Sequence, residues 1–136
     1  TWANANMELS NLNDIRWIVE DAMAFVKKEV RRGKKYNGII LDPPAYGHGT
    51  EGQKWKLEDM ISEMMQHVIA LLDEHERFLI LNTYSLGFSS LIVENLLGKQ
   101  SAASGGKDLQ SGELYLQSRT GLKLPLGVFG RFCKIA

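Results

Sequence analysis

The sequence has few of the features that mark secreted, membrane or nucleic-acid-packaging proteins. Its single cysteine, Cys133, cannot form an internal disulfide. The longest apolar runs, at residues 39–41 and 68–72, are far shorter than the roughly 20 residues that cross a bilayer. Because 16 Lys and Arg balance 16 Asp and Glu, a histone-like polycation is excluded. The start shows no basic and then apolar leader pattern, so we expect a cytoplasmic protein.

The composition that remains is ordinary for a globular protein. Of the 136 residues, 44% are hydrophobic and 24% are charged. This length allows one domain with a sizeable core and leaves no room for two, so residues 1–136 are expected to form a single domain. Because the sequence starts at Thr1, directly in a helix-like pattern, we expect further sequence upstream.

Helical and strand patterns alternate along the chain. We expect helices over residues 1–12, 22–30, 57–72 and 89–97, the last ending at Gly98. We expect strands over residues 15–19, 36–41, 77–81, 113–118 and 128–135, and loops over residues 45–54 and 100–111, the second of them flexible. The alternation predicts a Rossmann-like α/β fold: a mostly parallel sheet with helices on both faces. No helix separates the last two strands, which predicts an antiparallel pair at the sheet edge.

Ligands of an open α/β sheet bind beyond the carboxyl ends of its strands, so three strand tips are candidate sites: residues 20–22, 42–46 and 82–85. The clearest signal is Asp42-Pro43-Pro44, because two prolines fix φ and remove two backbone donors. A rigid turn rich in acceptors suits the amino group of a base or a cofactor, and Tyr46 could stack on a flat ring. The alternative is that the turn only ends a strand.

The other candidates have equally ordinary alternatives. Glu20, Asp21 and Ala22 offer carboxylates and free N–H groups at a helix start, which could bind a heterocycle or could simply be a helix cap at Asp21. His48 lies in a glycine-rich loop that could be a lid, and Trp55 could cover a ligand or pack under that loop. The basic cluster at residues 27–35 could contact phosphates or be a solvated helix end.

Two classes of motif are missing. The sequence has neither a Gly-x-Gly-x-x-Gly fingerprint nor a Walker loop, so no dinucleotide or nucleoside triphosphate cradle is expected. His48, His67 and His75 have no metal-ligand spacing with the one cysteine, so no metal site is expected either.

The strand tips and the terminal pair, taken in order, resemble the class I S-adenosylmethionine-dependent methyltransferases, close to the bacterial branch related to the large-subunit ribosomal RNA methyltransferases. The matching stretches cover residues 15–22, 36–47, 112–114 and 124–129. The resemblance implies S-adenosylmethionine as cofactor, with Glu20, Asp21 and Ala22 on the cofactor side of the site. Asp21 and Ala22 would lie at the adenine. It implies that Asp42, Pro43 and Pro44 lie beside the methionine end and the substrate. Tyr46 would flank the transfer pocket.

The resemblance has departures that matter. The glycine-rich first motif of the family and the acid that holds the ribose would lie upstream of Thr1, so the chain would be the C-terminal part of a methyltransferase domain and inactive alone. The tip at residues 82–85 lacks the cysteine nucleophile of the 5-methylcytosine members, and Cys133 is expected to be a small core residue. Ala45 separates the prolines from Tyr46, unlike the usual amino-methyltransferase tetrapeptide. The methylated atom therefore stays open.

Two functional hypotheses follow. The first is a methyltransferase that acts on RNA, with ribosomal RNA suspected. The second is a non-catalytic module that keeps the sheet and binds RNA or protein through the basic cluster. A truncated core without a function of its own is a third possibility. Because strands without neighbours expose their edges, self-association of this chain is also expected.

Overall fold

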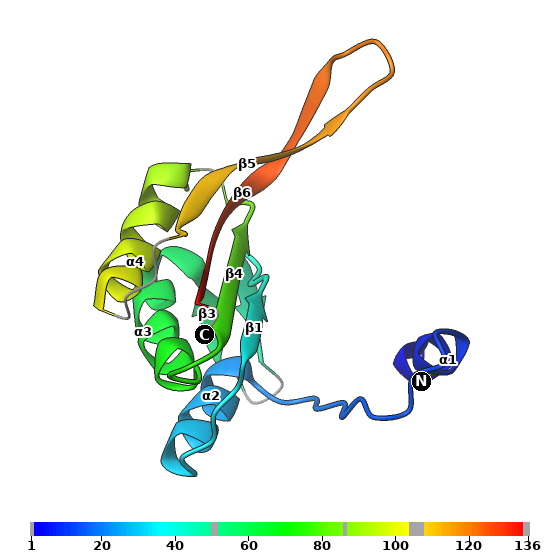
Figure 1. Ribbon diagram of the computed structural model, residues 1–136. Coiled ribbons are helices and arrows are strands. Elements are labelled where there is room, and N and C mark those ends of the chain that lie inside the picture. The colour runs from blue at the N-terminus through cyan, green and yellow to red at the C-terminus, as the bar shows by residue number, and fades with distance from the viewer. Residues whose placement is uncertain (1, 50–51, 86, 104–107, 135–136) are drawn as a thin grey trace.

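The computed structural model describes residues 2–49, 52–85, 87–103 and 108–134. Figure 1 shows the arrangement of the elements. The helices are α1 (Trp2–Leu9), α2 (Ala22–Arg31), α3 (Leu57–Ala70) and α4 (Ser90–Ala103). The strands are β1 (Gly38–Leu41), β2 (Tyr46–His48), β3 (Lys54–Lys56), β4 (Arg77–Thr83), β5 (Gln110–Gln117) and β6 (Lys123–Lys134).

Four strands form the main sheet in the order β1-β4-β6-β5. β1 pairs with β4 in parallel, and β6 is antiparallel to both β4 and β5. The predicted α/β fold and its terminal antiparallel pair are therefore confirmed. The described sheet is mixed and not mostly parallel, because only the β1–β4 pairing among these strands is parallel. Because β1 and β4 run in the same direction, their carboxyl ends lie side by side, with Leu41 opposite Leu81.

The hydrophobic core lies between this sheet and helices α3 and α4, which lie on the same side of it (Figure 1). Leu79 and Leu81 of β4 are completely buried there. Close packing of α4 on β6 depends on Gly130, because a Cβ at this position would lie 2.5 Å from Val93 Cγ1 and 2.6 Å from Leu97 Cδ1. The apolar residues whose spacing predicts a helix from residue 57 lie largely on the face of α3 that is buried.

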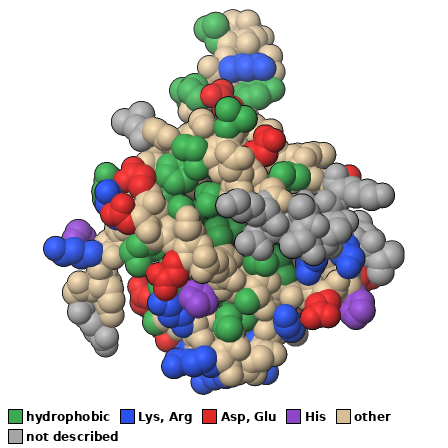
Figure 2. Space-filling model, turned by 90° about the vertical axis from the view of Figure 1, so that its left-hand side faces the viewer, with side chains coloured by type: hydrophobic (Ala, Val, Ile, Leu, Met, Phe, Trp, Pro, Cys, Tyr) green, Lys and Arg blue, Asp and Glu red, His purple; other side chains and the backbone are tan. Residues whose placement is uncertain are grey.

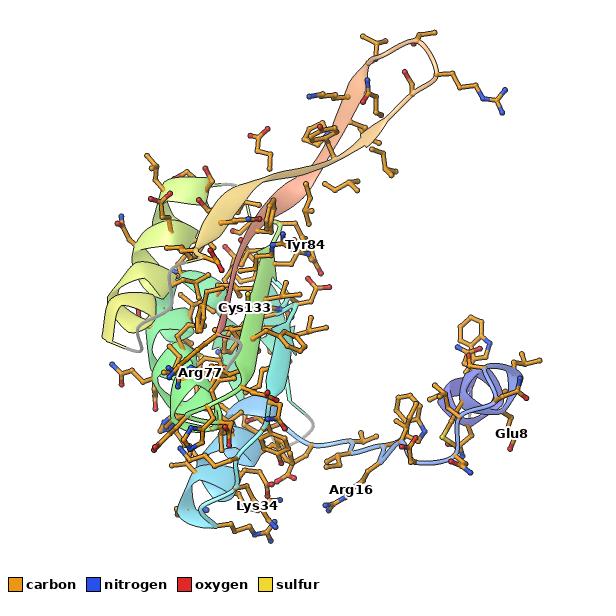
Figure 3. The ribbon with its side chains drawn as sticks, in the orientation of Figure 1. Glu8, Arg16, Lys34, Arg77, Tyr84 and Cys133 are labelled. Carbon is orange, nitrogen blue, oxygen red and sulfur yellow. The ribbon has the colours of Figure 1, made fainter. Side chains whose placement is uncertain are left out.

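The strand expected at residues 15–19 does not form, and that prediction was wrong. This segment is extended and exposed, with Trp17 49% exposed, and it leads away from the sheet past Arg16 to α1 (Figure 3). α1 forms as expected but buries no residue. A strand needs a hydrogen-bonding neighbour, and β1 pairs only with β4 among the described residues. Because apolar side chains are exposed in this segment, we still expect the isolated chain to self-associate.

Two expected loops contain regular structure instead. The segment at residues 45–54 contains β2 and the start of β3, which pair as a short antiparallel hairpin, while residues 50–51 lie outside the described residues. Helix α4 continues through Gly98 to Ala103, and β5 begins at Gln110, so much of the expected loop at residues 100–111 is helix or strand. Residues 104–107 of that loop lie outside the described residues. A glycine inside a helix costs only about 1 kcal/mol, which packing elsewhere can offset.

The ends of β5 and β6 form an arm, residues 114–126, that projects from the body (Figures 1 and 2). The last residue of β4, Thr83, pairs with Val128, so the arm continues beyond the carboxyl end of β4. Every residue of the arm is exposed. Pro125 is tolerated inside β6 because β6 has only β5 as a neighbour there, so the missing N–H breaks no pairing on a second side.

Helix α2 is joined to the segment that precedes β1 by the buried carboxylate of Glu29. It accepts hydrogen bonds from the Tyr36 hydroxyl at 2.6 Å and from Arg32 Nη1 at 2.9 Å. The hydrogen bond from Tyr36, and after it the one from Arg32, hold the pKa of Glu29 below its ordinary value. The same bond raises the pKa of Tyr36.

We expect acid to weaken the fold through this cluster. Because the pKa of Glu29 is lower in the folded than in the unfolded chain, its stabilisation is complete above the unfolded value of 4.5 and is lost as the pH falls through the folded value. Glu29→Gln should therefore lower Tm at pH 7, and the difference from the natural chain should shrink below pH 4.5. Thermal melts over this range test it, with Glu8→Gln on the exposed α1 as the control. A difference that is the same at every pH would contradict the expectation.

Candidate active site

A pocket of about 750 Å³ opens where the carboxyl end of β1 meets the start of α2 and the β2–β3 hairpin. It is lined by residues 19–24, 40–44 and 47–49, together with Gln53, Trp55 and Met64. This volume lies in the range of about 300–1,000 Å³ that is usual for small-molecule sites. The structure thus brings two of the three predicted strand tips, residues 20–22 and residues 42–44, into one pocket.

Asp42 lies at the end of β1, and its carboxylate is held from the neighbouring strand. Asn82 Nδ2, at the carboxyl end of β4, donates to Asp42 Oδ1 at 2.9 Å. Asn82 does not itself line the pocket, and its Oδ1 is buried with no hydrogen-bond partner among the described residues. The bond to Asp42 therefore accounts for the orientation of this amide, and it leaves Asp42 Oδ2 available to a ligand.

The turn after Asp42 is fixed through its carbonyl oxygens. Trp55 Nε1 donates to Pro44 O at 2.6 Å, and the backbone N–H of Leu57 donates to Ala45 O at 3.0 Å. Pro43 and Pro44 line the pocket, as expected. Tyr46, in contrast, does not line it and is 65% exposed on β2.

The start of α2 forms another part of the pocket wall. Asp21 caps the helix by accepting from the backbone N–H of Ala24 at 2.8 Å, so the ordinary reading of this residue is correct. Glu20 forms an ion pair with Lys28 at 2.6 Å. Because Glu20, Asp21 and Ala22 also line the pocket, the cap does not remove them from a ligand's reach.

The basic cluster is largely neutralised or engaged. Lys27 pairs with Glu63 at 2.6 Å, Lys28 with Glu20, and Arg32 with Glu29, while Lys35 donates to the Ala70 and Leu72 carbonyls near the end of α3. Its far end, at Lys34, lies at the bottom of the body in Figure 3, well below Tyr84, which follows β4. The cluster therefore leaves few free cations among the described residues, and its Lys28 contacts the strand tip at residues 20–22 only as the partner of Glu20.

Trp55 and the β2–β3 hairpin contribute to the pocket in a way that the sequence does not predict. Trp55 lines the pocket and also packs against the core, so the packing reading has support and a contact with a ligand stays a prediction. His48 lines the pocket from an exposed position on β2. The only sequence signal for the hairpin was the alternation of Lys54, Trp55 and Lys56 after a glycine-rich stretch.

Two further classes of feature are missing from the described part of the chain. No group of three His, Cys, Asp or Glu side chains in residues 2–49, 52–85, 87–103 and 108–134 could hold a metal ion. No helix among these residues is long and apolar enough to cross a membrane. Cys133, expected in the core, is only partly buried, on β6 opposite the half-exposed Phe78.

Comparison with solved structures identifies the fold. The crystal structure of a SAM-dependent methyltransferase from Agrobacterium tumefaciens matches with a TM-score of 0.87 and 34% identity, over 96% of this chain and 44% of that chain. SMU.776, a candidate methyltransferase complexed with S-adenosylhomocysteine (SAH), matches with a TM-score of 0.63 at 18% identity, over 96% of this chain and 35% of that one. A candidate SAM-dependent methyltransferase from Streptococcus mutans gives the same score and identity and is covered over 34% of its length. No protein-family model and no curated protein sequence matches.

The chain therefore has the class I fold of S-adenosylmethionine-dependent methyltransferases. It spans less than half the length of each of these solved chains.

Proposed function

We propose that this protein is an S-adenosylmethionine-dependent methyltransferase and that this chain carries the substrate side of its active site. The observation that carries the proposal is Asp42, fixed by Asn82 at the carboxyl end of β1 and facing a pocket of suitable size. The strong match to the Agrobacterium methyltransferase supports it, and the SAH in SMU.776 supports the cofactor. The glycine-rich part of the cofactor site would come from sequence upstream of Thr1.

The charge of the pocket fits this cofactor. Three carboxylates line it, those of Glu20, Asp21 and Asp42; Lys28 pairs with the first, and neither lysine nor arginine is among the described lining residues. S-adenosylmethionine carries a sulfonium and an ammonium group against one carboxylate, and so a net positive charge. An acidic pocket attracts such a ligand and would repel a nucleoside triphosphate.

The residues of the chain would act mainly by alignment. The cofactor supplies a methyl group already activated by the positive sulfur, so the protein needs to place the nucleophile in line with it and to exclude water. Glu20, Asp21 and Ala22 would hold the cofactor side. Asp42 Oδ2 would accept a hydrogen bond from the substrate's nucleophilic group. This acceptor favours a substrate that presents an N–H.

RNA is the substrate class that we propose, with large-subunit ribosomal RNA as the first to test. The arm contains Arg119 and Lys123 and no acidic residue, and it leaves the sheet at the same end as Asn82. Its charge is opposite to that of a phosphate backbone, and a large substrate bound at Asp42 could contact it. The alternative of a docking module that uses the cations of α2 loses its support, because most of them are already paired.

The proposal is tested by transfer of tritiated methyl groups from S-adenosylmethionine to an unmodified transcript of bacterial large-subunit ribosomal RNA. The natural sequence extended upstream of Thr1 should label the transcript, and the 136-residue chain should label it weakly or not at all. If a protein extract offered as an alternative substrate is labelled and the RNA is not, RNA is overturned as the substrate and the methyltransferase assignment stands. Labelling of neither would count against both.

Removal of the amide that holds Asp42 should reduce transfer. We expect Asn82→Ala to lower kcat about tenfold, because the carboxylate is then free to rotate away from the nucleophile. The affinity for SAH should stay within about twofold, since Asn82 does not line the pocket. Asn37→Ala is the matched control, because Asn37 donates to Glu76 O at the other end of β1. Equal losses in both variants would contradict the positioning role.

A further inference from the structure

The turn at residues 42–45 has an unusual constraint on how it can be held. Pro43 and Pro44 have no backbone N–H, so neither can donate a hydrogen bond that would fix the chain. Apart from side-chain packing and the bond from Asn82 to the Asp42 carboxylate, the turn is therefore fixed mainly through its carbonyl oxygens. The donors to two of them, Trp55 Nε1 and the Leu57 N–H, both come from the short stretch where β3 runs into α3.

Trp55 connects this turn to the rest of the molecule. It is the central residue of β3 and lies opposite Gly47 of β2. The two strands pair with no other strand among the described residues, and an isolated two-stranded ribbon is only marginally stable in water. Because the half-buried indole packs against the hydrophobic core, it anchors the hairpin as well.

We propose that Trp55 is a positioning residue for methyl transfer: its indole N–H holds the Asp-Pro-Pro turn so that Asp42 keeps a fixed place in the pocket. This inference rests on the proposed function. Asp42 is then set from two directions, through its carboxylate by Asn82 and through its main chain by Trp55. A displacement of about 1 Å at a reacting group can cost about 100-fold in rate, so the second constraint matters as much as the first.

The same contacts bear on the chemistry of the substrate. Pro44 O and Ala45 O each already accept a hydrogen bond from the β3–α3 junction. The Asp42 carboxylate and the Pro43 carbonyl are therefore acceptors that the turn can still offer to the pocket, which both residues line. The arrangement selects a nucleophile with an N–H to donate, such as an amino group on a planar heterocycle.

The decisive variant is Trp55→Phe, which keeps an aromatic ring in the hairpin and removes only the donor. In the upstream-extended protein, with the ribosomal RNA transcript as substrate, kcat should fall tenfold or more, while KM and the affinity for SAH stay within about threefold. Trp17→Phe is the matched control, since Trp17 is exposed and lies outside the pocket lining. It should leave all three quantities unchanged.

A second measurement needs no substrate. The chain has three tryptophans, so a nitrogen-15 correlation spectrum of the 136-residue chain contains three indole N–H signals. The signal that Trp55→Phe removes should exchange with deuterium at least about tenfold more slowly than the other two, because Trp2 and Trp17 are exposed. Rapid exchange of all three would overturn the inference, even if the variant itself failed to fold.

The outcomes separate this inference from the proposed function. If Trp55→Phe keeps the full kcat while Asp42→Ala abolishes transfer, Trp55 has no positioning role and the methyltransferase assignment stands. If Asp42→Ala also keeps the full kcat, the strand tip is not the reacting centre. The proposed function itself fails only if the upstream-extended protein with the natural sequence transfers no methyl group. If Trp55→Phe instead raises KM by as much as or more than it lowers kcat, the indole contacts substrate and the positioning role is overturned.

Discussion

Asp42→Ala is expected to reduce methyl transfer by about 10³-fold and to leave the fold intact. The carboxylate lies at the exposed end of β1. Among the described residues, its hydrogen-bond partner is Asn82. Its loss therefore removes little packing. The substitution removes the acceptor that orients the nucleophile toward the activated methyl group. The contribution of this acceptor is largest at the transition state.

The measurement is the rate of tritium transfer to the ribosomal RNA transcript, followed together with Tm. Asp14→Ala is the control, because Asp14 is exposed in the extended segment outside the pocket. The natural rate in Asp42→Ala, with a normal Tm, would show that the strand tip is not the reacting centre. A lost rate together with a large drop in Tm would show that Asp42 is needed for the fold, against the expectation.

Gly127→Ala is expected to destabilise the fold by about 3 kcal/mol. Gly127 has a φ of +134°, which side chains rarely adopt, and an added Cβ would lie 2.5 Å from the carbonyl oxygen of Thr83. The residue sits where the arm leaves the sheet, beside an irregularity in the pairing at Leu114 and Tyr115. Backbone, rather than a flexible side chain, would have to move to make room.

The control for this prediction is Gly121→Ala in the turn of the arm. Gly121 also has a positive φ, +88°, but an added Cβ there would meet open space. It should cost only about 1 kcal/mol in the free energy of unfolding, measured by denaturant titration. Equal losses at the two positions would show that the close approach to Thr83 is unimportant. Because Thr83 follows Asn82, Gly127→Ala should also reduce transfer in the protein that remains folded.

The sequence predicts those elements whose pattern is local. Helices α2 and α3 follow from the spacing of their apolar residues, and the cap at Asp21 is read correctly from a carboxylate just before the first turn. The strand expected at residues 15–19 fails for a reason that no local pattern contains. Its β-branched and aromatic residues have the propensity for a strand, but no neighbour is described for them to pair with.

The candidate site divides in the same way. The Asp-Pro-Pro tip is recognisable because proline chemistry is local, and its nearness to residue 82 follows from the parallel pairing of consecutive βαβ strands. The bond between Trp55 and Pro44 could not be predicted, because it depends on a hairpin of three-residue strands that carries almost no pattern. The exposure of Tyr46 follows from the same hairpin, which places Tyr46 and Trp55 at adjacent ladder positions with side chains on opposite faces.

The most direct test of the account is calorimetric titration of SAH into the protein extended upstream of Thr1, alongside the same protein with Glu20→Gln and Asp21→Asn in the pocket wall. The account predicts saturable binding by the extended protein, and binding at least about tenfold weaker once the two carboxylates are neutralised, because both line the pocket. No binding by the extended protein, or equal binding by both forms, would contradict the claim that this pocket holds the methyl donor.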